Sequence, residues 1–154
     1  MKKILILSVF CITALLSACH QEKSEAVFQD NQGQTIQFSK LHGKWIFINY
    51  WATWCHSCMA ELPVLNQFYK NNKNNNIIIL GVNYDGLPNS KIMIVVKNLQ
   101  IQFPVLLENP DTALKLADVA VVPTTFVINP SGQLVKTLLG PQTLLTLNQA
   151  MKNP

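Results

Sequence analysis

The sequence contains no arginine, so all 12 of its basic residues are lysines, against 8 acidic residues. Two of the lysines stand at the very start of the chain, and the remainder carries 10 − 8 = +2. These ten lysines are scattered and form no cluster. Proteins that bind nucleic acid usually gather their positive charge on one face. We therefore expect no nucleic-acid partner.

Internal repeats and a second domain are also absent from the sequence pattern. The chain has 154 residues, the size of one domain, and 49% of them are hydrophobic. We expect strands at 27–30, 34–38, 45–50, 77–83, 103–107, 121–129 and 134–139, and helices at 61–70, 90–100, 111–117 and 141–151. Residues 90–100 also admit a strand, and we expect a turn at 39–44 and a polar loop at 71–76. This order of elements predicts an α/β domain.

The first 18 residues resemble an export signal. Two lysines precede an apolar run, 4–16, that is too short for a comfortable membrane span. The run ends in Leu16-Ser17-Ala18-Cys19, which resembles the lipobox of bacterial lipoproteins, where the leader is cut before the cysteine and the cysteine carries the lipid. We favour lipidation of Cys19. Ordinary cleavage after Ala18, or an uncleaved anchor, are the alternatives.

These features divide the chain into a lipoprotein signal peptide at 1–18, a tether at 19–26 and one folded domain at 27–154. We expect the protein in the cell envelope, on the periplasmic or other extracytoplasmic face, anchored to the lipid bilayer through Cys19. His20 follows this cysteine in place of aspartate, which favours the outer membrane in a Gram-negative source.

The rest of the chain is organised around a Cys-x-x-Cys pair, Cys55 and Cys58. The pair lies between an apolar run predicted to be a buried strand, 45–50, and a segment, 61–70, whose apolar residues recur at helical spacing. One of the other two cysteines leaves with the leader and the second is Cys19. In the oxidising conditions that an exported protein meets, a pair at this spacing can form a disulfide.

A position at a helix start would make Cys55 a nucleophile. The first turn has unpaired N–H groups and the positive end of the helix dipole, and both stabilise a thiolate. We expect Cys55 to be the exposed attacking sulfur and Cys58 to be the more buried, resolving sulfur. His56 and Ser57 could tune the redox chemistry through charge and hydrogen bonding. Glu61 could manage the proton of Cys58 or be a solvated surface residue.

Other kinds of site compete for the cysteine pair. A zinc site needs two more ligands, and the only histidines, His20, His42 and His56, show no matching spacing. A purely structural disulfide would close so short a loop that it stabilises little. A copper site of two thiolates and one histidine would suit Cu(I), and this alternative stays open. Our main expectation is redox chemistry without a metal or another cofactor.

Several motifs together resemble one family. Asn-Tyr-Trp-Ala-Thr-Trp-Cys-His-Ser-Cys at 49–58, Glu61 with Pro63, and Val-Pro-Thr-Thr-Phe at 122–126 are similar to the TlpA/ResA/CcmG (DsbE) thioredoxin-like oxidoreductases. The likeness runs from about residue 27 to the last helix. It implies a thioredoxin-like fold with a central mixed sheet flanked by helices, an N-terminal hairpin and an inserted helix and strand.

The resemblance also implies roles for single residues. Pro123 would be the cis-proline that faces the disulfide, with Val122 and Trp54 as further substrate contacts. Glu61 falls on the active-site glutamate of the family. Asn49 stands where ordinary thioredoxins carry a buried aspartate.

By this resemblance the protein would be a lipid-anchored thiol-disulfide oxidoreductase that reduces substrate proteins, such as apocytochrome c in cytochrome c biogenesis. Its electrons would come from a membrane thiol reductase. Ser57 stands where many members carry a proline. The two residues between the cysteines set the redox potential in this family, so a thiol oxidant or isomerase is an alternative. A copper chaperone of the Sco type is another, although such proteins space their cysteines by three residues. A third is a peptide-binding lipoprotein that uses the fold as a scaffold.

Overall fold

A computed structural model describes residues 25–72 and 75–152. The predicted signal peptide, Cys19 and most of the tether lie outside these residues. The elements in chain order are β1 (Val27–Gln29), β2 (Thr35–Gln37), the 3-10 helix η1 (Phe38–Leu41), β3 (Trp45–Trp51), α1 (His56–Asn72), β4 (Ile77–Asn83), α2 (Asn89–Asn98), β5 (Val105–Leu106), α3 (Asp111–Leu114), β6 (Thr124–Ile128), β7 (Leu134–Leu139) and α4 (Leu144–Ala150). Among the helices of the described residues, none is both long and apolar enough to cross a membrane.

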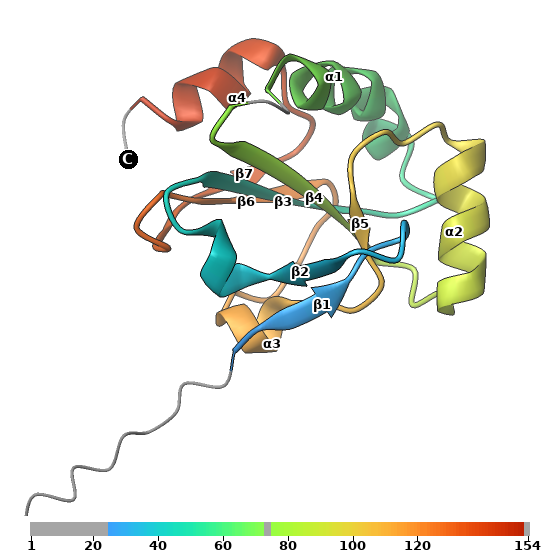
Figure 1. Ribbon diagram of the computed structural model, residues 1–154. Coiled ribbons are helices and arrows are strands. Elements are labelled where there is room, and N and C mark those ends of the chain that lie inside the picture. Colours follow the sequence, from blue (N-terminus) through green and yellow to red (C-terminus); the bar gives the residue numbers. More distant parts are fainter. Residues whose placement is uncertain (1–24, 73–74, 153–154) are drawn as a thin grey trace, which may run out of the picture.

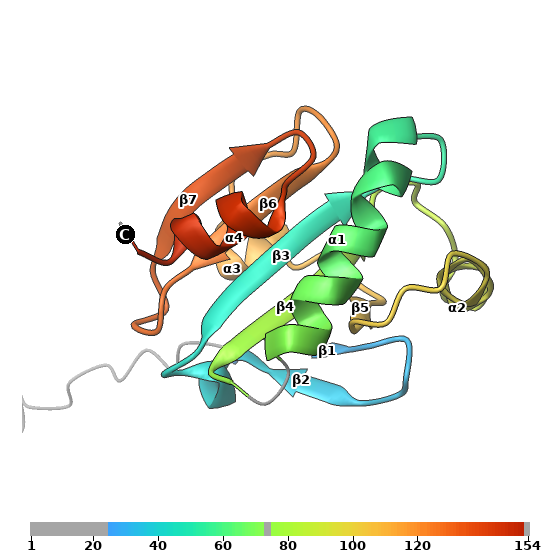
Figure 2. The ribbon, with the colours of Figure 1, turned by 90° about the horizontal axis from the view of Figure 1, so that it is seen from above.

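A five-stranded sheet in the order β5-β4-β3-β6-β7 forms the centre of the domain (Figures 1 and 2). β4 runs parallel to both β3 and β5, whereas β6 runs antiparallel to β3 and β7. β1 and β2 form a separate antiparallel hairpin. The predicted mixed sheet, N-terminal hairpin and inserted helix and strand (α2 and β5) are therefore confirmed, and the fold is thioredoxin-like.

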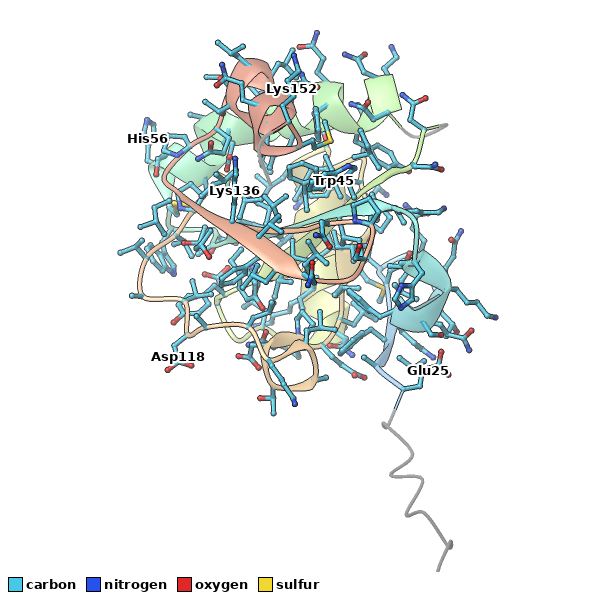
Figure 3. All side chains as sticks on the ribbon, turned by 90° about the vertical axis from the view of Figure 1, so that its left-hand side faces the viewer. Glu25, Trp45, His56, Asp118, Lys136 and Lys152 are labelled. Atoms are coloured by element: carbon cyan, nitrogen blue, oxygen red, sulfur yellow. A yellow bond between two sulfur atoms is a disulfide. The ribbon has the colours of Figure 1, made fainter. Side chains whose placement is uncertain are left out.

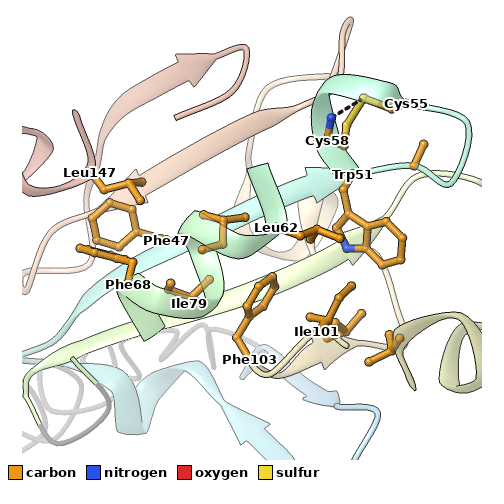
Figure 4. Packing of buried hydrophobic residues seen from close by; sticks show 14 of the residues in the cluster. Phe47, Trp51, Cys55, Cys58, Leu62, Phe68, Ile79, Ile101, Phe103 and Leu147 are labelled. Atoms are coloured by element: carbon orange, nitrogen blue, oxygen red, sulfur yellow. Dashed lines mark hydrogen bonds between the residues drawn. A yellow bond between two sulfur atoms is a disulfide. The ribbon is translucent and has the colours of Figure 1, made fainter. Parts of the chain in front are cut away.

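The central strand β3 is buried on both faces. Successive side chains of a strand point to opposite faces, so Phe47 and Trp51 pack on the side of α1 and α4, while Ile48 and Tyr50 pack toward the hairpin and α3. The ring of Phe47 meets that of Phe68 edge to face, with centroids 5.2 Å apart (Figure 4). Burial of each such side chain contributes about 1.5–3 kcal/mol. This packing fixes the end of β3, where the cysteine pair begins.

Gly81 of β4 lies close to side chains of neighbouring elements. A Cβ atom there would lie 3.0 Å from side-chain atoms of Phe103 and Val105 and 3.2 Å from Nε1 of Trp51. Glycine is therefore required for its lack of a side chain. Because residue 81 has no Cβ atom, the inserted segment can pack against Trp51. Trp51 lies four residues before Cys55.

Several boundaries differ from the prediction, among them the start of α1, which is His56 instead of residue 61. α1 continues to Asn72, into the segment expected to be a loop, and the segment 39–44, expected to be a turn, begins inside η1. α3 ends at Leu114 rather than at residue 117, because Lys115 adopts the left-handed conformation, with φ 55°.

The start of α4 was also predicted wrongly, at Pro141 instead of Leu144. Thr143 is the N-cap: its Oγ1 accepts the N–H of Thr146 at 3.1 Å, and its own N–H donates to Oγ1 of Thr146 at 2.9 Å. This capping box satisfies two backbone donors that would otherwise be unpaired. Pro141 therefore belongs to the loop between β7 and α4, which contacts the site described below.

Candidate active site

A disulfide joins Cys55 and Cys58 at the junction of β3 and α1, with Cα atoms 5.2 Å apart (Figure 4). The helix begins at His56, so Cys55 directly precedes the helix and Cys58 lies in its first turn, which confirms the predicted position of the pair at a helix start. The backbone N–H of Cys58 donates to Sγ of Cys55 at 3.1 Å, and the hydroxyl of Ser57 lies 3.4 Å from the same sulfur. After reduction, these donors would stabilise negative charge on Cys55.

Cys55 is less exposed than the sequence led us to expect. It is 6% exposed and Cys58 is 1% exposed, so the expected order is right but the expected openness of Cys55 is wrong. The carbonyl oxygen of Val122 lies 3.5 Å from Sγ of Cys55 and covers part of it. The neighbouring Trp54, by contrast, is 69% exposed.

The loop before β6 brings distant residues to the disulfide. Its Val122–Pro123 peptide bond is cis, and Pro123 is buried. The hydroxyl of Thr124 donates to the carbonyl of Val121 at 2.7 Å, and the N–H of Gly140 donates to the carbonyl of Pro123 at 2.9 Å. These bonds fix the loop from both sides. The structure thus brings Val122 beside Cys55, 67 residues away in the sequence.

Exposed apolar side chains lie on the segment that carries the disulfide and on residues next to the loop before β6. We call four of them the apolar rim: Trp54, Tyr84, Val121 and Leu139, which are 69%, 45%, 52% and 66% exposed. The first adjoins Cys55 and the third adjoins Val122 in the sequence. Leu139 lies opposite Thr124 in the β6–β7 register, and the hydroxyl of Tyr84 donates to the carbonyl of Val119 at 2.8 Å. The rim offers an apolar surface beside an otherwise enclosed sulfur.

Glu61 is buried, at 2% exposed, one helical turn after Cys58. Its Oε1 accepts the N–H of Gln142 at 2.8 Å, and its Oε2 accepts Nδ2 of Asn49 at 3.2 Å. Burial raises the pKa of Glu61 to about 7, although both hydrogen bonds lower it. The alternative of a solvated surface glutamate is therefore wrong. This carboxyl changes its charge near neutral pH.

The turn before the cysteines is fixed by Asp85. Its Oδ2 accepts the backbone N–H of Thr53 at 2.9 Å and Nδ2 of Asn83 at 2.8 Å. Asp85 lies in the segment between β4 and α2, so the inserted region supports the approach to Cys55. This contact was not predictable from the sequence, since an acidic residue after a strand is commonly a solvated turn residue.

Gln142 and Thr125 were also missed. Gln142 touches Glu61 through its backbone N–H, so the identity of its side chain carries no signal of the contact. Thr125 accepts from Nδ2 of Asn49 at 2.9 Å across two neighbouring strands. Only the strand register, which places Asn49 opposite Thr125, reveals this pair.

The two histidines of the described residues, His42 and His56, do not join the cysteine pair in a metal site. Across residues 25–72 and 75–152, no three side chains of His, Cys, Asp or Glu come close enough together to hold a metal ion. His56 is exposed at the first position of α1, on the opposite side of the domain from Glu25 (Figure 3). His42 lies at the turn that contains Gly132. In the described part of the chain, no histidine lies where it could be the third ligand of a copper site at Cys55 and Cys58.

Known proteins are similar to this chain in sequence and in fold. Residues 20–137 match the AhpC/TSA family. The thiol-disulfide oxidoreductase ResA of Bacillus subtilis (strain 168) is 39% identical over 119 residues, which cover 76% of this chain and 65% of that protein, slightly under two thirds of its length. ResA of Bacillus anthracis is 30% identical over 136 residues, which cover 86% of this chain and 76% of that protein.

Among solved structures, the exposed lipoprotein thioredoxin of Streptococcus pneumoniae strain TIGR4 superposes with a TM-score of 0.73. It is 26% identical, and the match covers 85% of this chain and all of that chain (100%). The chain therefore belongs to the AhpC/TSA family and, within it, to the thioredoxin-fold group of ResA-type thiol-disulfide oxidoreductases.

Proposed function

We propose that the protein reduces disulfides of other exported proteins through Cys55 and Cys58. The observation that carries this proposal is the disulfide at the start of α1, with the carbonyl of Val122 3.5 Å from Sγ of Cys55. An attacking sulfur here would lie beside a backbone segment with which an extended substrate can pair. The apolar rim would hold apolar side chains next to the substrate cysteine.

The reaction would run in two exchange steps. The Cys55 thiolate attacks one sulfur of the substrate disulfide, forms a mixed disulfide and releases the other substrate sulfur as a thiolate. The Cys58 thiolate then attacks Sγ of Cys55, which releases the second substrate sulfur and leaves the Cys55–Cys58 disulfide. Two electrons pass from the enzyme dithiol to the substrate. The described structure corresponds to the oxidised end of this cycle.

In this mechanism Glu61 takes the proton that Cys58 must lose before the second step. It lies one helical turn after Cys58, is shielded from water, and has a pKa raised to about 7. A base with a pKa near the working pH is suited to exchange a proton with a thiol. His56 is exposed next to Cys55 and would act on the thiolate only through its charge when protonated.

The direction of electron flow is tested by the reduction potential of the Cys55–Cys58 couple. We expect a value near that of thioredoxin, about −270 mV, because the proposed role is that of a reductant. Equilibration with glutathione or dithiothreitol buffers, followed by alkylation, measures it. A value near about −120 mV, as in a strong oxidant, would instead assign the protein to disulfide formation.

For the substrate, we propose apocytochrome c, whose Cys-x-x-Cys-His segment must be reduced before haem attachment. The ResA relatives are named as thiol-disulfide oxidoreductases, which supports the activity, and their names specify no substrate. Rates of reduction should be compared for two oxidised peptides, one with Cys-x-x-Cys-His and one with the same residues in scrambled order around the cysteines. Equal rates would contradict a preference for the haem-attachment segment.

We also propose that Cys19 carries the lipid and that a membrane thiol reductase supplies the electrons. The lipobox-like Leu16-Ser17-Ala18-Cys19 supports the anchor, as does the name of the structural neighbour, an exposed lipoprotein thioredoxin. Mass spectrometry of the mature protein should show an acylated N-terminal cysteine. A Cys19→Ser variant should leave the membrane fraction, and an unmodified Cys19 in the wild type would remove this part of the proposal.

A further inference from the structure

Three buried polar side chains form a line of hydrogen bonds that runs from Thr125 through Asn49 to Glu61. Asn49, Thr125 and Glu61 are 0%, 1% and 2% exposed and come from β3, β6 and α1. Nδ2 of Asn49 donates to Oε2 of Glu61 at 3.2 Å and to Oγ1 of Thr125 at 2.9 Å, so both of its N–H groups are used. Its amide oxygen, Oδ1, is buried and has no partner within the described residues.

The unpaired Oδ1 indicates that Asn49 is oriented to donate a hydrogen bond to Glu61. A buried acceptor without a donor is unfavourable. The orientation nevertheless gives Glu61 an N–H donor, which a charged carboxylate requires more strongly than a neutral acid does. If the amide turned over, Oδ1 would face Oε2 of Glu61, where it would repel a carboxylate but accept a hydrogen bond from a protonated carboxyl.

Thr125 suits both orientations. A hydroxyl group can accept a hydrogen bond from Nδ2 or donate one to Oδ1, because it carries both a donor and acceptor lone pairs. We propose that Asn49 is a positioning residue for Glu61 that turns its amide with the charge on this carboxyl, and that Thr125 holds the amide in either orientation. The functional consequence rests on the proposed proton transfer between Cys58 and Glu61, but the coupling itself does not.

Among residues 25–72 and 75–152, no charged side chain is a cause of the shifted pKa of Glu61. β3 contributes Asn49, β6 contributes Thr125, and the loop between β7 and α4 contributes the backbone N–H of Gln142. On α1 itself the nearest titratable group toward the active site is Cys58, three residues earlier, which is held in the disulfide. The raised pKa of Glu61 arises from burial, not from a neighbouring charge.

The test is an NMR titration of the oxidised protein labelled with 13C at glutamate carboxyls. The sequence has four glutamates, and a Glu61→Gln variant identifies the Glu61 signal. We expect the side-chain amide signals of Asn49 to shift with the same midpoint as this carboxyl, and to stop doing so in Glu61→Gln. Asn49→Leu should raise the Glu61 midpoint by about one pH unit, because the charged form loses the stronger hydrogen bond.

Thr125→Val is the second variant and should raise the midpoint by a smaller amount. Thr124→Val is the matched control: it replaces a buried threonine of the same strand that bonds to Val121 instead, and should leave the midpoint unchanged. If Asn49→Leu does not fold, the Glu61 midpoint in Thr125→Val tests the proposal. The proposal would be overturned by any of three results. These are an unchanged Glu61 midpoint in the folded variants, an equal shift of this midpoint in the Thr124→Val control, or Asn49 amide signals that do not follow the titration of Glu61. The oxidised protein needs no substrate, so this result is independent of the reductase assays.

Discussion

The N–H of Gly140 donates a hydrogen bond to the carbonyl oxygen of Pro123 at 2.9 Å. Two residues later, the N–H of Gln142 donates to the buried carboxylate of Glu61 at 2.8 Å. The Gln142 side chain closes this segment by donating from Nε2 to the carbonyl of Gly140 at 2.8 Å. One short loop between β7 and α4 therefore supports both the cis-proline loop beside Cys55 and the buried acid that follows Cys58.

The two cysteines should differ in reactivity. We expect the lone thiol of a Cys58→Ser variant, Cys55, to react with iodoacetamide at least about tenfold faster at pH 7 than the lone thiol of Cys55→Ser. The reason is that Cys55 is more exposed and accepts the N–H of residue 58 at the helix start. Alkylation followed by mass spectrometry measures both rates. Faster labelling of Cys58 would reverse the proposed roles of attacker and resolver.

Glu61 should make the oxidised protein less stable as the pH rises. Its folded pKa of about 7 lies above the ordinary value of 4.5, so between these values the folded state binds a proton that the unfolded state has released. The stabilisation is therefore complete below pH 4.5 and is lost as the pH rises through 7, by about 3 kcal/mol in total. Denaturant unfolding of wild type and Glu61→Gln from pH 4 to 8 should show the variant with the flatter profile.

The control for this series is Glu108→Gln, which changes an exposed glutamate. It should follow the wild-type profile throughout. If Glu61→Gln also followed the wild type, the buried carboxyl would not be the source of the pH dependence.

Removal of the Trp54 side chain should weaken substrate binding without unfolding the protein. Trp54 is 69% exposed, so Trp54→Ala should change the free energy of unfolding by no more than about 0.5 kcal/mol. Exposed aromatic side chains often dominate binding, and we expect kcat/KM for a peptide disulfide to fall about tenfold, mainly through KM. Ile94→Ala on α2, where Ile94 is 60% exposed outside the apolar rim, is the control. Equal losses in both variants would argue against the rim as the substrate surface.

Gly81→Ala should destabilise the domain. The added methyl group would lie 3.0 Å from two side-chain atoms in the core, and overpacking of this kind costs about 1–3 kcal/mol. The melting temperature and denaturant midpoint measure the loss. Gly33→Ala, at a left-handed turn where nothing lies within 4 Å of the added atom, isolates the cost of backbone strain alone. Wild-type stability of Gly81→Ala would show that β4 and β5 can separate.

The parts of the fold that depend on local pattern were predictable from the sequence. The β3–α1 junction, the cysteine pair and the β4 run are encoded by apolar periodicity and by residues within one or two turns of each other. The start of α4 was not, because Pro141 and Thr143 are both favourable at a helix start. The reciprocal hydrogen bonds of Thr143 and Thr146 decide between them.

The environment of Glu61 was even less accessible to sequence reasoning. Its burial depends on Gln142, 81 residues away, and on Asn49, 12 residues away on another element. The helical spacing from Cys58 could suggest that Glu61 shares a face with it, but not whether water or a loop covers that face. The enclosure of Cys55 by Val122 has the same cause, a contact between distant segments.

Glu25, where the described part of the chain begins, lies across the domain from His56 (Figure 3). With Cys19 acylated as proposed, 25 − 19 = 6 residues separate the lipid from Glu25. They span at most about 20 Å when fully extended. A domain of this size is roughly 35 Å across, so a domain that stands away from the membrane on this tether would hold the disulfide in the aqueous layer, beyond the lipid headgroups. In that orientation, the proposed membrane reductase would reach the disulfide through thiols carried on a part that projects from the bilayer.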